Sequence, residues 1–257
     1  MATDNNRKNS EIGGVPPLVR PVVENFIRDI VAKLGANLES MALTGSVLTK
    51  DFIPQSSDIN SVVVLKEMDF KVLDGLSVLG RKYRKKRIRA PLLMTPEYIS
   101  RSLDVFPVEF LDIKVLHRTV YGPDIFSDLK VERPMLRVQC ERDLKSRLIN
   151  LRQGYIKSVG LRSVLLKLIL DAYSGFFPLF RAIIYVVQDL DIPPIAKNEV
   201  LDTVESTYGV DMSCFRQVME LRLKKRPRLG PDETSRLFQE IYLAIERFAI
   251  KLDEIRL

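Results

Sequence analysis

The spacing of apolar residues changes near residue 130, and this change constrains the fold more than any other feature of the sequence. Before it, short apolar runs alternate with segments of helical period, whereas after it the apolar positions repeat at helical spacing. The connector between the two patterns, YGPDIFSDLKVERP, contains two prolines and a glycine. We therefore expect an α+β domain over residues 15–130, an all-helical bundle over 131–257 and a disordered lead-in over 1–14.

The first domain is expected to alternate helices and strands. Prolines near its start and Gly35 after its end favour a first helix over 17–34, and Thr95 is the expected N-cap of a short later helix. Another helix is predicted over 69–84. Runs of apolar, β-branched and aromatic residues predict four strands: LESMALT, INSVVVL, IRAPLLM and FPVEFLDIKVL.

The second domain is expected to be helical throughout. Its first predicted helix begins near Leu136 and ends near Gly160, and Phe176, Phe177 and Phe180 are predicted core residues. Glycines and prolines separate the later helices, which are predicted over 161–175, 178–190, 195–207, 212–223 and 232–256.

The composition excludes several kinds of site. The chain holds 40 Lys plus Arg against 33 Asp plus Glu, a formal net charge of +7, and its basic pI of about 9.3 is suggestive of an RNA partner without deciding for one. A single histidine, His117, argues against a histidine-rich metal site and is interpreted as structural. The two cysteines, Cys140 and Cys214, lie far apart and are expected to be reduced thiols in helices.

The most apolar stretch, residues 164–187, is interpreted as a buried helical segment. Lys167, Asp171 and Arg181 interrupt it, whereas a membrane span needs about 18–20 nearly uncharged residues. The polar N-terminus lacks the apolar segment of a signal peptide. We therefore expect a cytoplasmic protein with no membrane partner.

The most informative stretch joins two predicted strands and reads LTGSVLTKDFIPQSSDINSVVVL. Because strand side chains alternate, Asp58 and Asn60 are expected on one face of the second strand, where their oxygens can hold a divalent cation. At the end of the first strand, Gly45 allows close approach of the backbone to a phosphate, and Ser46 can hydrogen-bond to it. The stretch therefore predicts a phosphate and metal site.

This stretch resembles the motif of the nucleotidyltransferase superfamily of the DNA polymerase β type, which has Gly-Ser, a loop, Asp-x-Asp and a later strand with a third carboxylate. The chain looks most like small bacterial nucleotidyltransferase-domain proteins and, more distantly, aminoglycoside nucleotidyltransferases, in which a helical bundle follows the catalytic domain. The resemblance implies an α+β fold in which a mixed sheet with flanking helices precedes an all-α bundle.

The resemblance also implies residue roles. Asp58 and Glu109 are then catalytic residues and metal ligands, and Asn60 is a weaker ligand. Glu109, in Pro-Val-Glu-Phe, is favoured as the third carboxylate or base, and Asp112, expected on the opposite strand face, is the second choice. The implied nucleotide-binding residues are Gly45, Ser46, Lys50 and Ser57.

Mg²⁺ is the implied cofactor and a nucleoside triphosphate the implied substrate, because two magnesium ions clamp the reacting oxygens in phosphoryl transfer. The chain departs from the family pattern in carrying Asn60 instead of a second aspartate. It also has Leu48-Thr49-Lys50 where active members often have Ala-Arg-Gly. The lost negative charge leaves one ion expected at Asp58 and weakens the site of the second.

Two functions of different classes follow from these residues. The first is transfer of a nucleoside monophosphate, AMP from ATP, to a hydroxyl of a small molecule, protein or RNA. The alternative is a catalytically lapsed domain that binds a nucleotide or another protein, which Asn60 favours. Whether the chain forms a homo-oligomer is left open. The basic run RKYRKKRIR, residues 81–89, is interpreted as a solvated helix end, with an anion-binding patch as the alternative.

Overall fold

The computed structural model describes residues 12–188, 195–224 and 226–255. Contacts between residues divide the chain into two compact units, the first formed by residues 1–103 and 112–130 and the second by 104–111 and 131–257. Residues 104–111 thus group with the second unit, whereas the sequence pattern assigns them to the first. Most of the predicted lead-in lies outside the described residues, but Ile12 is buried in the first unit.

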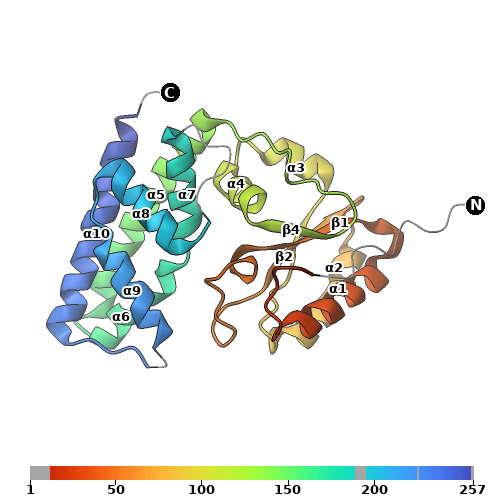
Figure 1. Cartoon of the computed structure of the whole chain (residues 1–257), viewed down its shortest axis with the longest axis horizontal. Helices are drawn as coiled ribbons and strands as arrows, with labels where there is room; N and C mark the ends of the chain where they lie inside the picture. The colour runs from red at the N-terminus through yellow and green to blue at the C-terminus, as the bar shows by residue number, and fades with distance from the viewer. Residues whose placement is uncertain (1–11, 189–194, 225, 256–257) are drawn as a thin grey trace, which may run out of the picture. The chain divides into compact units, whose positions relative to one another are not determined.

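The first unit contains a four-stranded mixed sheet with the strand order β3-β2-β1-β4 (Figure 1). β1 (Leu38–Thr44) is antiparallel to β2 (Asn60–Leu65) and to β4 (His117–Tyr121), and β2 is parallel to β3 (Leu92–Met94). The register pairs Thr44 of β1 with both Asn60 and His117. The carboxyl end of β1 therefore meets the amino ends of β2 and β4.

Two helices, α1 (Arg20–Leu34) and α2 (Phe70–Arg84), cover one face of this sheet (Figure 1). The buried residues of α1 recur at intervals of three and four, as expected for a helix with one apolar face. The Phe26 ring meets the Tyr83 ring edge to face at 5.1 Å, and the Tyr83 hydroxyl donates to Asp29 at 2.7 Å. These contacts join the two helices on this face of the sheet.

The predicted strand FPVEFLDIKVL is wrong, because this segment forms helix α4 (Pro107–Val115). Proline at the first helical position fixes a helical φ, and the buried side chains of Val108 and Leu111 are three residues apart, as are those of Phe110 and Ile113. The strand is instead β4, which begins directly after α4.

The third predicted strand, IRAPLLM, is only partly confirmed. Its regular part is limited to β3, while Ile88 forms an isolated parallel bridge with Ile59. A 3₁₀ turn (Gly35–Asn37) separates α1 from β1, and a second one (Gly45–Leu48) follows β1. The short helix α3 (Pro96–Ser102) begins as predicted, since the Thr95 hydroxyl accepts from the Tyr98 N–H at 3.1 Å.

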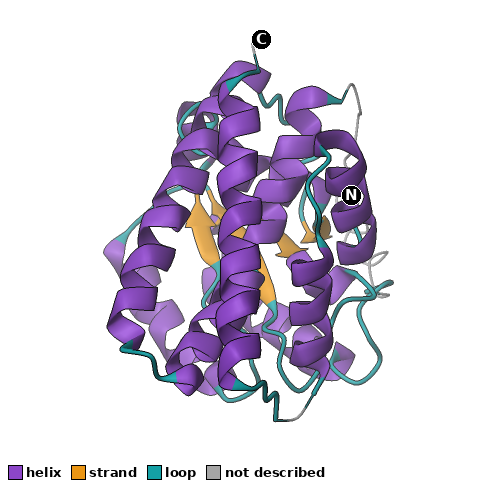
Figure 2. Ribbon diagram, turned by 90° about the vertical axis from the view of Figure 1, so that its left-hand side faces the viewer, coloured by secondary structure: helices purple, strands orange, loops and turns teal. Residues whose placement is uncertain are grey.

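The second unit is helical, as predicted, and Figure 2 shows its helices running side by side. An aromatic cluster forms much of its core. The ring centroid of Phe180 lies 5.1 Å from that of Phe215 and 5.6 Å from that of Phe248. Phe176, Phe177 and Phe180 are buried as expected. The helices are α5 (Arg133–Ser158), α6 (Arg162–Tyr173), α7 (Phe176–Val187), α8 (Lys197–Tyr208), α9 (Ser213–Leu223) and α10 (Pro231–Asp253).

Among the described residues, no single helix has both the length and the apolar character needed to cross a bilayer. Together α6 and α7 satisfy the length and composition criteria, but they are bent by 47° at the break between them. Most side chains of α7 are buried within the helical unit. The apolar stretch therefore forms part of the protein core, as the sequence predicts.

Candidate functional site

The carboxyl end of β1 brings the Gly-Ser pair next to the start of β2. Gly45 has a φ of 76°, a left-handed conformation that glycine adopts without strain, and it turns the chain out of the sheet into a 3₁₀ turn. A Cβ built on Gly45 would lie 3.7 Å from the Asn60 amide nitrogen, so the two residues are close neighbours. The Gly45 N–H donates to the carbonyl of Leu116 at 3.0 Å and is therefore already used within the sheet.

The loop between the two strands is held by its own hydrogen bonds. The Ser57 hydroxyl accepts from the N–H of Ile53 at 3.0 Å, and the Thr49 hydroxyl donates to the carbonyl of Ser46 at 3.1 Å. Lys50 is exposed at the surface of this loop. Ser57 thus stabilises the loop, while Lys50 is accessible to an anion in solution.

Asp58 lies at the centre of a charged cluster that the sequence reasoning did not identify. Arg87 places its Nη2 atom 3.1 Å from Oδ1 of Asp58, and Arg89 places Nη2 at 2.6 Å and Nε at 2.7 Å from Oδ2. The Asp58 side chain is 26% exposed, against 43% for Arg87 and 69% for Arg89. Two guanidinium charges against one carboxylate leave this cluster with a net charge of +1.

The backbone of residues 87–89 is fixed beside Asp58. The Ile59 N–H donates to the carbonyl of Arg87 at 2.8 Å, and the Arg89 N–H donates to the carbonyl of Ile59 at 3.0 Å. Arg87 has a φ of 60°, which is uncommon for a residue other than glycine, asparagine or aspartate. Its side chain donates to the carbonyls of Ser56 and Ser57, and these bonds hold the conformation in place.

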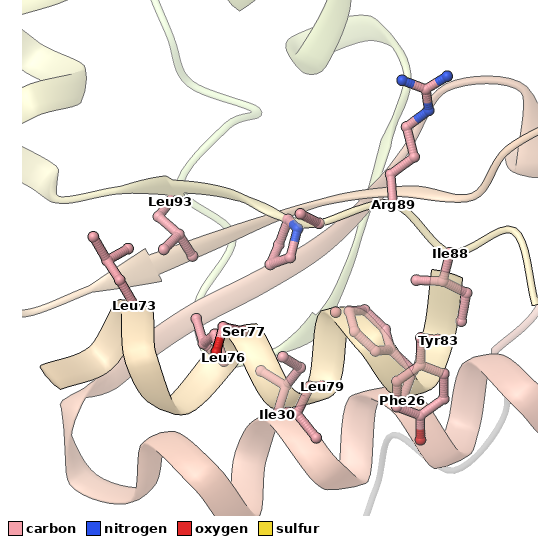
Figure 3. A pocket seen from close by; sticks show the side chains of 13 residues that line it. Phe26, Ile30, Leu73, Leu76, Ser77, Leu79, Tyr83, Ile88, Arg89 and Leu93 are labelled. Carbon is pink, nitrogen blue, oxygen red and sulfur yellow. The ribbon is translucent and has the colours of Figure 1, made fainter. Parts of the chain in front are cut away.

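An apolar pocket of about 260 Å³ lies on the other side of this segment, toward α1 and α2. In Figure 3 the side chains of Ile88 and Leu93 point toward the pocket, whereas the Arg89 guanidinium points away from it. Ile88 and Arg89 are consecutive residues, and side chains of consecutive residues in an extended segment point to opposite sides. Ile88 therefore anchors the segment in the core and leaves the arginine side chains free to face Asp58.

The residues around Asp58 fit one magnesium ion better than two. A carboxylate offers about four lone-pair sites, two on each oxygen. Nη2 of Arg87 occupies one of the two sites on Oδ1 of Asp58, and Nη2 and Nε of Arg89 occupy both sites on Oδ2. The remaining site on Oδ1 and the amide oxygen of Asn60 are hard ligands that suit a single ion. Within the described residues no group of three or more His, Cys, Asp or Glu side chains could hold a metal ion.

Glu109 belongs to the second unit and lies in the first turn of α4. Its Oε2 atom accepts from Nε2 of Gln139 at 2.7 Å, and the same amide lies 3.3 Å from Oδ2 of Asp143. The N–H of Val108 fixes the other end of the amide by donating to Gln139 Oε1 at 2.9 Å. Gln139 is only 4% exposed, so this network holds the Glu109 carboxylate in a defined orientation.

Asp112 does not lie on the opposite face from Glu109, because both residues are on α4. Side chains three apart on a helix share a face. The backbone carbonyl of Asp112 accepts from the N–H of Leu116 at 2.9 Å. The sequence reasoning missed Gln139 and Asp143, whose spacing of four on one helix was the available signal.

Both cysteines are buried free thiols on helices, as predicted. Burial, together with the negative charges of Asp143 and Glu109, raises the pKa of Cys140 well above its ordinary value. Burial also raises the pKa of the Cys214 thiol, to about 12. Neither thiol therefore has the thiolate character that nucleophilic catalysis requires.

His117 opens β4 and is structural, as the sequence suggests. Its Nε2 atom lies 2.9 Å from Oδ1 of Asp124, and its Nδ1 lies 3.0 Å from the carbonyls of Ile113 and Lys114. The imidazole ring also packs edge to face on Phe126 at 5.5 Å. All of these contacts lie within the first unit, and they stabilise the connection between the end of α4 and the start of β4.

The fold of the chain matches that of a solved adenyltransferase. The chain is similar in structure to spectinomycin adenyltransferase AAD(9) from Enterococcus faecialis, which was solved with ATP and spectinomycin. The TM-score is 0.54 at 12% sequence identity, over 90% of this chain and 98% of the other. No protein-family profile and no curated protein sequence matches the chain. The α+β nucleotidyltransferase fold expected from the motif is thereby confirmed.

Proposed function

We propose that the chain transfers AMP from ATP to a hydroxyl group of an acceptor. The observation that carries this proposal is the strand-end arrangement in which Gly45 lies beside Asn60 and Ser46 follows in the same turn, on a fold shared with an ATP-using adenyltransferase. Because that neighbour was solved with spectinomycin, a small molecule is the first acceptor to test. A protein or an RNA is the alternative.

The residues of the chain have distinct parts in this proposal. In the transfer, the acceptor oxygen attacks the α-phosphorus, and the bond to the leaving pyrophosphate breaks. The turn at Gly45 and Ser46 lies against the triphosphate, and Asp58 with Asn60 would hold a magnesium ion. When bound, that ion supplies positive charge that neutralises the triphosphate. The resemblance to the superfamily assigns Glu109 the role of taking the proton of the acceptor hydroxyl, and Gln139 orients the Glu109 carboxylate.

A lapsed nucleotide-binding domain is the second candidate. The ion pairs of Asp58 with Arg87 and Arg89 favour it, because two adjacent positive charges oppose the binding of a divalent cation. Asn60 favours it as well, since an amide adds no negative charge to the site. A protein of this kind would bind ATP and leave it intact.

A transfer assay with ATP labelled in the α-phosphate tests both candidates, with spectinomycin and fractionated cell extract as acceptors. We expect Glu109→Gln to bind ATP as the wild type does but to lose transfer by about 100-fold or more, because a general base contributes that much. Asp58→Ala should lose the magnesium-dependent part of ATP binding in calorimetry. Asn60→Asp should strengthen that part by restoring a charge.

The outcomes separate the two functions. Label transferred to any acceptor by the wild type supports the enzyme, and ATP binding without transfer supports the lapsed domain. Brisk transfer by the wild type that falls on Asn60→Asp would mean that Asn60 works in a different kind of site. ATP binding that is unchanged in Asp58→Ala would remove Asp58 from the nucleotide site altogether.

A further inference from the structure

The last two arginines of the basic run differ in their surroundings from the rest of the run. Arg81 and Arg84 lie exposed in the last turn of α2, where positive charge complements the helix dipole. Arg87 and Arg89 lie beyond the end of α2, on the segment that bridges to Ile59, and both reach Asp58. The interpretation of the run as a solvated helix end therefore applies to its first part only.

The contacts of these two arginines favour an anionic ligand. Arg87 is the last residue of the turn after α2, Arg89 lies two residues further on, and the side chains of both reach Asp58. Guanidinium groups bind phosphate oxygens through directed N–H donors. A cluster with a net charge of +1 attracts a polyanion such as a triphosphate.

The cost of transferring these guanidinium groups from Asp58 to a phosphate is small. Both arginine side chains are substantially exposed, and exposed ion pairs contribute little free energy because water and salt screen them. The backbone, in contrast, is held firmly, since Arg87 keeps a positive φ through the bonds of its own side chain to the loop. Strained backbone of this kind is often found at ligand-binding sites.

We propose that Arg87 and Arg89 bind the triphosphate of the nucleotide and that Asp58 orients their guanidinium groups for it. The proposal rests on the proposed function and deepens it by naming the residues that neutralise the phosphates. It also accounts for Asn60: with two guanidinium groups at the site, a second carboxylate for a second metal ion is not needed for charge neutralisation. ATP should therefore bind to the protein even when magnesium is removed.

Calorimetric titration of the whole chain with ATP, with inorganic tripolyphosphate and with adenosine, each in EDTA, tests the proposal. The variants are Arg87→Gln with Arg89→Gln, the same pair changed to lysine, and Arg89→Gln alone, which keeps the loop contacts of Arg87. The matched control is Arg81→Gln with Arg84→Gln, which removes the same charge from the end of α2. Thermal unfolding of each variant confirms that it is folded.

We expect the glutamine pair to weaken binding of ATP and tripolyphosphate by about tenfold or more, and the control to weaken it by less than about threefold. The lysine pair should fall between these, because lysine keeps the charge without the paired donors. Equal losses in the glutamine pair and the control, or no loss in either, would overturn the proposal. If the protein binds tripolyphosphate through Arg87 and Arg89 but does not bind ATP, the phosphate-binding role of the two arginines is supported. The proposed function is then refuted. Binding of neither ligand would refute both.

Discussion

Asp124 holds the residues that follow β4 through several contacts on one carboxyl group. Its Oδ1 accepts from the N–H of Phe126 at 3.0 Å and lies 2.9 Å from the His117 ring, and its Oδ2 accepts from the Ser127 hydroxyl at 2.6 Å. Burial by itself would raise the pKa of Asp124, but these hydrogen bonds lower it from 3.8 to about 2. The folded state therefore favours the ionised carboxylate.

A lowered pKa in the folded state makes stability depend on pH in a definite direction. The contribution of Asp124 is fully present above pH 3.8 and is lost as the pH falls through about 2. Asp124→Asn should therefore lower the free energy of unfolding at pH 7 by about 1 kcal/mol, a value reduced for solvent screening because the side chain is 42% exposed.

Urea unfolding of the wild type and of Asp124→Asn at pH 7, 5, 3.5 and 2.5 measures this effect. The difference between the two proteins should shrink as the pH falls toward 2, because the wild-type carboxyl group then becomes protonated. A difference that stays constant over this range would show that the carboxylate charge plays no part.

At the same scale, the sequence predicts some contacts of the candidate site and not others, for a physical reason. The closeness of Gly45 to Asn60 is accessible to prediction, because the antiparallel register pairs Thr44, the residue before Gly45, with Asn60. The pairing of Asp58 with Arg87 and Arg89 is not accessible to prediction in this way. It depends on a single bridge between Ile59 and Ile88, which are 29 positions apart in the sequence. Charge patterning alone does not separate Arg89 from Arg84.

Among the elements, the antiparallel contact of β1 with β4 depends on a close approach at Gly122. The residue has a φ of 72°, and a Cβ built on it would overlap the backbone carbonyl oxygen of Glu39. Glu39 lies where the register of β1 against β2 shifts, which is typical of a bulge. The hydroxyl of Ser40 reinforces the contact by donating to the carbonyl of Pro123 at 2.7 Å.

Gly122→Ala should destabilise the protein by more than about 2 kcal/mol, since a left-handed φ and a backbone overlap act together. Gly209→Ala is the control: that residue has a φ of 61° after α8, and nothing lies within 4 Å of its built Cβ. The control substitution should lower the free energy of unfolding by about 1 kcal/mol, because only the left-handed backbone conformation opposes the added Cβ. Thermal unfolding of both variants measures the difference, and equal losses would mean that β1 shifts without strain.

Helix α4, which the sequence pattern predicts to be a strand, shows where apolar periodicity does not distinguish a strand from a helix. In the run FPVEFLDIKVL, buried residues occupy positions 107, 108, 110, 111, 113 and 116, so the pattern contains both period-two and helical spacings. Such a short apolar run does not by itself distinguish a strand from a buried helix. By contrast, LESMALT was predicted correctly because its seven residues lie between a helix stop at Gly35 and a left-handed glycine at position 45.

At the scale of the whole molecule, the second unit includes a segment from outside its continuous stretch of sequence. Residues 104–111 group with residues 131–257, and among them Val108, Phe110 and Leu111 are buried. Gln139 of α5 depends on the same segment, because the N–H of Val108 and the carboxylate of Glu109 are its hydrogen-bond partners. The helical unit is therefore incomplete when it is cut at the connector near residue 130.

A fragment of residues 131–257 should accordingly be far less stable than a fragment of residues 104–257. Burial of an apolar side chain stabilises a fold by about 1.5–3 kcal/mol, so three of them amount to roughly 5–9 kcal/mol as an upper value. This is comparable to the whole stability of a typical domain, about 5–15 kcal/mol. The shorter fragment also leaves the buried amide of Gln139 without these partners, which adds a further penalty.

Circular dichroism during thermal unfolding compares the two fragments, and thiol labelling supplies a second measurement. Cys140 and Cys214 are buried in the helical unit and should resist a thiol reagent only where that unit is folded. We expect a cooperative transition and protected thiols in the longer fragment, and rapid labelling in the shorter one. Matching transitions and equal protection in both fragments would show that residues 104–111 merely lie against the helices without completing their fold.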